Sequence, residues 1–314
     1  MPYHFLPETT YRFHIYRHIP SERFLQYLAA RMKTRLSWVN ELLDDGHICH
    51  NGVTLSAAAA LSKGDLLEVY IPKYWPGYMA PTPLRLEVLF EDEFILALNK
   101  PSGIVVHPAR GHLSGDSLQN AVRHRCREYI GHENITISAC HRLDRDTTGV
   151  IIFSRTTEAF REMVYQFSKH KVRKTYHAMI SGLPSWSECI FDQPIGIDPS
   201  NSKKHAIMPD GKSALTHVRV LESGSSWALI EAVCLTGRPH QIRVHLSSAG
   251  YPLFGDDKYN PFYKASDINR QALHASCVEF DHPITQKPLS ISAPLPSDMN
   301  ELLLLLHITE NMSI

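Results

Sequence analysis

Residues 141–153 read HRLDRDTTGVIIF, a polar stretch with two arginines and two carboxylates that runs directly into four apolar residues. The apolar end predicts a buried strand, and Thr147-Thr148-Gly149 predicts a tight turn at its start. Enzymes often hold catalytic groups in a charged loop at the mouth of a sheet, where the scaffold keeps them rigid. The stretch therefore predicts a central strand and a candidate active site together.

Length and composition are those of an ordinary globular protein. The 314 residues, 43% hydrophobic and 20% charged, suffice for one large domain and a smaller one. No apolar run approaches membrane-spanning length and the N-terminus lacks a signal-peptide pattern, so we expect a cytoplasmic protein without a membrane partner. The six cysteines are scattered singly and the 19 histidines are dispersed, which predicts neither a disulfide framework nor a metal site.

The net charge is zero, so attraction to a polyanion would have to come from local clusters of basic residues. Such residues gather in the segments 12–35, 123–127 and 169–174. One cluster of this kind is more often a solvated face than a nucleic-acid site, whereas three of them favour a nucleic-acid partner without deciding the matter.

The first seventy or so residues predict a small α+β module. Ser21 can cap a helix that carries Phe24 to Met32, and a second helix should end near Gly46. Asn51-Gly52 predicts a hairpin turn, and a strand should follow at residues 66–71. Residues 73–83 are rich in proline and predict a semi-rigid linker.

Residues 84–305 predict an α+β domain with a mixed, mostly antiparallel sheet, because predicted strands often follow one another without a helix between them. Strands are expected at 86–90, 94–98, 149–154, 174–181, 214–221, 227–235, 275–280 and 289–292. Helices are expected at 118–129, after Thr156 or Thr157, at 239–249 and near the C-terminus.

The opening loop offers two candidate acids. Asp144 and Asp146 are two residues apart, so in an extended segment their carboxylates would face the same way, and the spacing does not choose between them. The neighbouring arginines would keep such a carboxylate ionised even when it is desolvated, as a carboxylate nucleophile requires.

Two other segments hold candidate residues. In KTYHAMISG, residues 174–182, Tyr176 is either a site residue or a core tyrosine with its hydroxyl satisfied. In TGRPHQIRVHL, residues 236–246, Pro239 predicts a helix start with Arg238 and Gln241 at helical spacing. Arg243 then either binds a phosphate or carboxylate or pairs with a structural acid.

Together, HRLDRDTTG, KTYHAMISG and TGRPHQIRVHL resemble the catalytic loop, tyrosine strand and arginine motif of the RluA/RluD branch of RNA pseudouridine synthases. Further similar segments, in the same order, extend the resemblance over roughly residues 84 to 300. Residues 12–72 resemble the small RNA-binding domain first known from ribosomal small-subunit protein S-four. That module is typical of family members that act on ribosomal RNA.

The resemblance implies a role for each motif. Asp144 would be the catalytic carboxylate, Tyr176 would lie against the target base, and Arg243 would pair with Asp144. Arg142 would fill the space that the flipped nucleotide leaves, and Asp146 would be structural. Other expected RNA contacts are Arg238, His240 and Gln241 in the arginine motif and Arg31, Lys33 and Arg35 in the N-terminal module. No cofactor and no metal are expected.

The implied reaction isomerises uridine to pseudouridine after the base leaves its stack, with the aspartate attacking either the anomeric carbon or the base. Large-subunit ribosomal RNA is the expected substrate because of the N-terminal module, and transfer RNA is the alternative. A non-catalytic RNA-binding factor stays open, as does a carboxylate-dependent hydrolase, which would need a second acid or a metal. We expect a monomer without an obligate protein partner.

Overall fold

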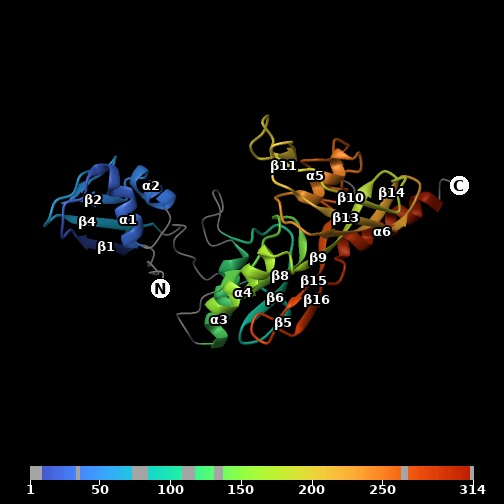
Figure 1. The fold of residues 1–314 in the computed structure, drawn as a ribbon, viewed down its shortest axis with the longest axis horizontal. Coiled ribbons are helices and arrows are strands. Elements are labelled where there is room, and N and C mark those ends of the chain that lie inside the picture. The colour runs from blue at the N-terminus through green and yellow to red at the C-terminus, as the bar shows by residue number, and fades with distance from the viewer. Residues whose placement is uncertain are drawn as a thin grey trace. The chain divides into compact units, whose positions relative to one another are not determined.

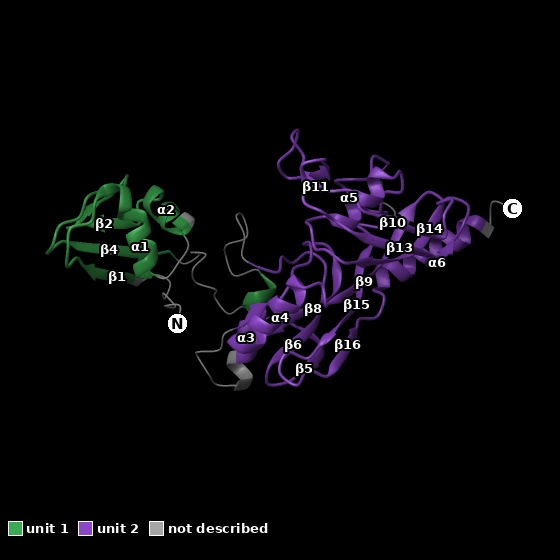
Figure 2. Ribbon diagram, viewed as in Figure 1, with its two compact units in different colours: residues 1–82, 108–120 green, residues 83–107, 121–314 purple. Residues whose placement is uncertain are grey.

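The computed structural model describes residues 9–32, 36–72, 84–107, 117–130, 137–262 and 268–311. The chain divides into two compact units, residues 1–82 with 108–120 and residues 83–107 with 121–314 (Figure 2). The predicted linker of residues 73–83 and two predicted RNA-contacting residues, Lys33 and Arg35, lie outside the described residues.

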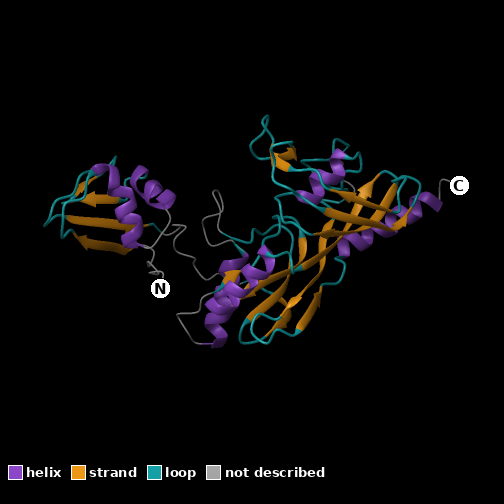
Figure 3. Ribbon diagram, viewed as in Figure 1, coloured by secondary structure: helices purple, strands orange, loops and turns teal. Residues whose placement is uncertain are grey.

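The first unit packs two helices against a four-stranded antiparallel sheet (Figure 3). The sheet order is β1 (Thr9–His14), β4 (Leu66–Ile71), β2 (Ile48–His50) and β3 (Val53–Thr54). The helices are α1 (Phe24–Met32), after the short turn η1 (Ser21–Arg23), and α2 (Leu36–Asp44). Their apolar faces meet the sheet in one core that includes Phe24, Val39 and Val69.

Two local predictions for this unit are confirmed and one is wrong. Asn51 and Gly52 both have positive φ, as a two-residue hairpin turn requires. Gly46 has φ +73° and follows the end of α2, as its left-handed freedom predicts. Ser21 is not a cap, because the turn begins at Ser21 itself and Pro20 precedes it without a side-chain hydrogen bond.

The second unit is built on a ten-stranded sheet (Figure 1). Its order is β10 (Glu188–Phe191), β13 (Thr216–Ser223), β14 (Trp227–Cys234), β9 (Arg173–Ser181), β15 (Leu273–Asp281), β8 (Thr148–Ser154), β6 (Ile95–Lys100) and β5 (Glu87–Glu91). In addition, β16 (Pro288–Ser292) pairs with β15, and β7 (Ser138–Ala139) pairs with β8. Only the β8–β15 pair is parallel among these described strands, so the predicted mixed, mostly antiparallel sheet is confirmed.

Helices cover both faces of this sheet. The unit contains α3 (Leu118–Ile130, whose first residues fall in the first unit), α4 (Thr157–Ser168), α5 (Gln241–Ser248) and α6 (Ser297–Asn311). Along β9, Ala178 and Ile180 pack with residues of α5, whereas Met179 packs with residues of α6. Alternate residues of a strand point to opposite faces, so α5 and α6 lie on opposite sides of β9. Among the described helices, none combines the length and apolar character that a membrane crossing requires.

Strand β8 carries the opening loop into the middle of the sheet. All seven of its residues are buried, between β6 on one side and β15 on the other. Gly149 has φ +111°, and a Cβ atom there would overlap the backbone of Ala275 on β15. The glycine thus permits the parallel pairing that begins at Thr148 and anchors the end of the loop.

Candidate active site

A turn shapes the loop between Ala139 and β8. The Thr147 amide donates to the Asp144 carbonyl over 3.1 Å, so the backbone is not extended between the two candidate acids. Asp146 pairs with the neighbouring Arg145, over 3.0 Å, while the Asp144 carboxylate has different partners. The turn therefore separates the two carboxylates that an extended segment would have aligned.

Lys100, the last residue of β6, anchors the loop through hydrogen bonds from its side chain. Its ammonium group is fully buried and donates to the carbonyl oxygens of Arg145 (2.7 Å) and Pro101 (2.8 Å). Burial lowers the pKa of Lys100 to about 7, although the charges of Asp146 and Asp144 oppose the shift. The sequence gives no sign of this role for Lys100, because the lysine reaches the loop only once β6 has paired with β8.

Arg243, on α5, links two aspartates. It makes a two-pronged hydrogen bond to Asp256, with both N···O distances 2.7 Å, and its Nη1 lies 3.1 Å from Asp144 Oδ2. Burial alone would lower the Arg243 pKa, but hydrogen bonds and charges from Asp256 and Asp144 raise it above its usual value. From the sequence, Arg243 could either bind a carboxylate of the site or pair with a structural acid. In the structure it does both, because it contacts Asp144 in the loop and the buried Asp256.

Asp256 was missed by the sequence analysis. Its side chain is completely buried, and its Oδ1 also accepts the backbone amides of Lys258 and Tyr259. These bonds wrap the segment FGDDKY, residues 254–259, around the Asp256 carboxylate, and the carboxylate in turn fixes the Arg243 guanidinium. The two aspartates of that segment were the available signal, but only Asp256 is buried, because Asp257 is 69% exposed.

His240 lies between α5 and the loop. It has φ +56°, so α5 begins at Gln241, and the predicted helix start at Pro239 is wrong by two residues. Its Nδ1 is 2.6 Å from the Tyr259 hydroxyl, whose oxygen also accepts the His205 amide over 2.8 Å.

When the Tyr259 hydroxyl donates to His240 Nδ1, the ring proton of neutral His240 lies on Nε2, 3.9 Å from Asp144 Oδ2. Burial lowers the pKa of His240 to about 4, against the charge of Asp144. The imidazole is thus neutral at physiological pH, and in this tautomer its N–H faces the carboxylate.

The candidate catalytic residues line one cavity of about 220 Å³, with Asp144, Tyr176 and Arg243 among its walls. Tyr176 reaches it from β9, and burial raises the pKa of its hydroxyl, with smaller contributions from Cys234 and Asp144. Arg142 is exposed and lines the same cavity. Five segments far apart in sequence therefore converge on it, namely the loop, β9, β14, the start of α5 and the start of β15.

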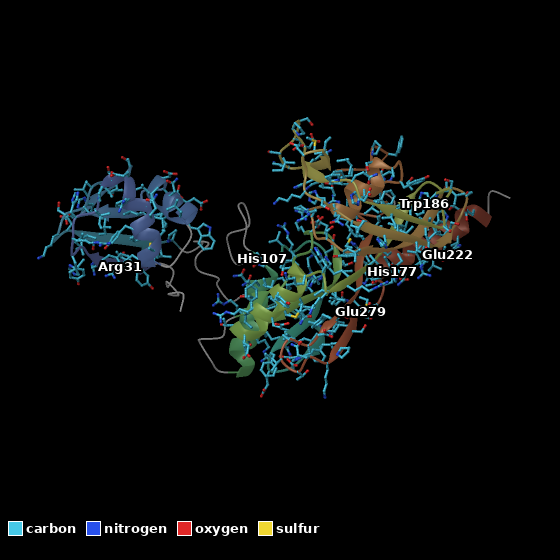
Figure 4. The ribbon with its side chains drawn as sticks, viewed as in Figure 1. Arg31, His107, His177, Trp186, Glu222 and Glu279 are labelled. Atoms are coloured by element: carbon cyan, nitrogen blue, oxygen red, sulfur yellow. The ribbon has the colours of Figure 1, made fainter. Side chains whose placement is uncertain are left out.

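The remaining predicted RNA contacts differ in their surroundings. Gln241 is buried, and both atoms of its amide already bond within the protein, to Thr236 and the Arg238 amide on one side and to Leu215 and Thr216 on the other. Arg238 donates through Nε to the Ser213 carbonyl and also lines the cavity. Arg31 is exposed on α1 of the first unit (Figure 4).

Lys174 was assigned to a surface cluster by the sequence analysis, but it is buried and lines the cavity. Its Nζ donates to the Thr236 carbonyl over 3.0 Å, and burial lowers its pKa. The strand period could have revealed this position, because residues two apart on β9 share a face and Tyr176 follows Lys174 at that spacing.

Comparison with known proteins identifies the family of the chain. Residues 94–248 match the family described as RNA pseudouridylate synthase. The chain is 38% identical over 288 residues to the uncharacterized RNA pseudouridine synthase YlyB of Bacillus subtilis, covering 90% of this chain and 93% of the relative. It is 35% identical over 295 residues to ribosomal large subunit pseudouridine synthase D of Zymomonas mobilis, covering 89% and 92%. Its fold is similar to that of human RNA pseudouridylate synthase domain containing 4, with TM-score 0.59, 26% identity and coverage of 70% and 93%.

Proposed function

The chain belongs to the RNA pseudouridylate synthase family, and on that premise we propose that it isomerises specific uridines of large-subunit ribosomal RNA with Asp144 as its nucleophile. The family makes it an isomerase. The observation that carries the assignment of Asp144 is its contact with buried Arg243 at the wall of a cavity that also holds Tyr176. The guanidinium of Arg243 gives that carboxylate a fixed, charge-assisted hydrogen bond, which orients it in the cavity.

The reaction breaks a glycosidic bond, rotates the uracil and forms a carbon–carbon bond to the same ribose. Asp144 attacks the anomeric carbon or the base, and in either route it must be ionised and free to approach. Arg243 meets Asp144 through Nη1, while its other contacts hold it to Asp256. The raised pKa of Tyr176 keeps its hydroxyl protonated at neutral pH, so the side chain offers the target base a neutral ring to lie against.

Flipping the base out of its stack costs a few kcal/mol, which favours loops over perfect duplexes. Arg142 is the proposed occupant of the vacated space, supported by its exposure beside the catalytic cavity. Arg238 and His240 are the proposed contacts at the wall of the cavity. Gln241 would act indirectly, because its side-chain amide bonds to Thr236 and to the Arg238 backbone amide and so positions Arg238 for the RNA.

Large-subunit ribosomal RNA is the proposed substrate because relatives that align with about nine-tenths of the chain bear that substrate in their names. We assign residues 12–72 as an S-four-like RNA-binding domain and residues 84–305 as the catalytic domain. Exposed Arg31, together with Lys33 and Arg35, would supply phosphate contacts. The protein would act as a cytoplasmic monomer without an obligate protein partner.

Substituting Asp144→Asn is expected to abolish pseudouridine formation, by at least about a thousandfold, while RNA binding is retained. The assay is single-turnover pseudouridine formation, with filter binding of the same RNA. Asp146→Asn is the matched control, because that carboxylate pairs with Arg145 and should leave activity near the wild-type level. Full activity of the Asp144→Asn variant would refute the assignment.

The substrate is tested by comparing pseudouridine maps of total RNA from cells with and without the protein. A site missing from large-subunit ribosomal RNA is the expected result, and loss of a transfer-RNA site alone would show that the ribosomal proposal is wrong. Incubating the purified protein with the affected RNA separates the other functions. An abasic product would identify a hydrolase, and RNA binding without any product would identify a non-catalytic factor.

A further inference from the structure

A second cavity, of about 390 Å³, adjoins the catalytic one. Arg238 and Pro239 line both cavities, so a single wall separates them. The far side of the second cavity is the hairpin of β11 (Ile195–Ile197) and β12 (His205–Ile207), which lies beside α5 (Figure 1). The proposed chemistry does not use this cavity.

The hairpin forms a firm wall for the cavity. Ile195 and Lys212 exchange two backbone hydrogen bonds, of 3.0 and 2.9 Å, which close the base of the hairpin. Gly211 permits this approach, because a Cβ atom there would lie 2.6 Å from the carbonyl carbon of Ile195. The cavity is therefore bounded by backbone segments that are bonded to one another.

The walls combine apolar groups with two cations and one exposed carboxylate, that of Asp210. Ile197 is 62% exposed, and Met208 and Pro239 also line the cavity. Arg238 is held by its Nε, and among the described residues neither of its Nη atoms has a hydrogen-bond acceptor or an acidic partner within 4.0 Å. Exposed Lys212 adds a second positive charge.

His205 adds a polar group that the fold does not explain. His205 lines the cavity, and its ring packs edge-on against that of His240, with 5.3 Å between the ring centroids. Its buried Nδ1 has no hydrogen-bond partner among the described residues. Buried polar atoms without partners are rare in folded proteins. Apolar surface for a base, free guanidinium nitrogens for a phosphate and an unpaired imidazole nitrogen together match the chemistry of a nucleotide.

We propose that this cavity is a subsite for the nucleotide next to the target uridine, with its base against Ile197 and Met208 and the linking phosphate at Arg238. The inference rests on the proposed function, because it requires an RNA whose uridine occupies the catalytic cavity. The shared wall of Arg238 and Pro239 identifies the occupant, because one phosphodiester can join two nucleotides whose bases lie on its two sides. The subsite makes the reaction sensitive to the base beside the target.

The test uses the RNA that the pseudouridine maps identify, synthesised intact and with an abasic nucleotide on either side of the target uridine. For the wild-type enzyme, one of the two abasic RNAs is expected to lose roughly tenfold to a hundredfold in kcat/KM, the range that stacking of one base supports. The double variant Ile197→Ala/Met208→Ala is expected to lose a similar factor with intact RNA and no further factor with that abasic RNA.

Ile190→Ala is the matched control, because Ile190 is 60% exposed on β10 and does not line this cavity. The proposal is overturned if neither abasic RNA reacts more slowly, or if the double variant loses the same factor with intact and abasic RNA. Failure of the ribosomal assignment is a separate result. If the maps identify transfer RNA, the same measurements on that RNA decide the subsite, and if wild-type enzyme forms no pseudouridine in any RNA, both proposals fail.

Discussion

At the scale of single residues, the site depends on how one buried cation is shared between two carboxylates. Arg243 has two short hydrogen bonds to Asp256 and a longer one to Asp144. The shorter bonds to Asp256 orient the guanidinium, and its Nη1 contacts Asp144, the proposed nucleophile. Asp144 thus meets a positive charge that is already held in place, so little reorganisation is needed when the carboxylate reacts.

Substituting Asp256→Asn tests this arrangement. Removing one charge from a buried ion pair is expected to destabilise the second unit by about 3–5 kcal/mol and to lower kcat by about a hundredfold. Thermal unfolding and single-turnover assays measure the two effects. Asp257→Asn is the control, because Asp257 is 69% exposed and 4.0 Å from Arg243, so we expect a change below about 1 kcal/mol. Equal effects of the two substitutions would contradict this role of Asp256.

The Tyr259 hydroxyl contacts His240 Nδ1, and we predict that this contact fixes the His240 tautomer and so affects catalysis, although Tyr259 does not line the catalytic cavity. In Tyr259→Phe, His240 Nδ1 and the His205 amide lose their partner, at about 1–2 kcal/mol of stability. With the ring free to hold its proton on Nδ1, we expect kcat to fall about tenfold and RNA affinity to stay unchanged. Tyr165→Phe, at an exposed tyrosine of α4, is the control. An unchanged kcat would show that the tautomer is irrelevant to the reaction.

At the scale of elements, the start of β8 decides where the catalytic loop ends. Gly149→Ala would force a Cβ atom into the Ala275 backbone at a positive φ, so we expect a loss of at least about 3 kcal/mol and a strong fall in activity. Gly103→Ala is the matched control, since Gly103 has φ +85° and open space around its Cβ position. It should lose only about 1 kcal/mol from backbone strain. Similar unfolding temperatures for the two variants would contradict this account of β8.

The long elements of the second unit could be predicted because each carries its own signal. The apolar run of β8 and the periodic apolar face of α4, capped by Thr156, are readable without any tertiary contact. The strands that could not be predicted from the sequence are short, with six residues or fewer: β1, β7, β10, β11 and β12. Such short strands exist because a partner pairs with them, and the partner of β1 is β4, more than fifty residues away.

Site residues that belong to a local sequence motif could be predicted, whereas features of the site that depend on contacts between distant segments could not. Asp144, Tyr176 and Arg243 were chosen through the family resemblance, and the structure places them around one cavity. The turn that separates Asp144 from Asp146 depends on a backbone bond, and the burial of Asp256 depends on α5 packing against the FGDDKY segment. Neither is encoded in residue spacing, so both needed the fold.

At the scale of the whole molecule, the proposed chemistry belongs to the second unit. Every residue that lines the catalytic cavity falls between 141 and 273, and this range lies entirely within that unit. The first unit has a separate core, and its proposed contribution is RNA affinity. Stability of the second unit therefore controls activity directly, and its buried titratable groups make that stability depend on pH.

Three histidines of the second unit predict the direction of this dependence. Burial lowers the pKa from 6.5 to about 3 for His141 and to about 4 for His240 and His274. In the unfolded chain these rings bind protons as the pH falls through 6.5, whereas in the folded protein they stay neutral down to about pH 4. The unfolded state binds more protons in this window, so stability present above pH 6.5 is lost as the pH falls toward 4. Burial also lowers the pKa of His177, His205 and His245. When urea unfolding is followed at a series of pH values, the pH dependence of the free energy of unfolding should therefore correspond to at least about three protons. His274→Gln should reduce that dependence by about one proton, and a free energy of unfolding that stays constant from pH 6.5 to 4 would show that the rings are not held neutral.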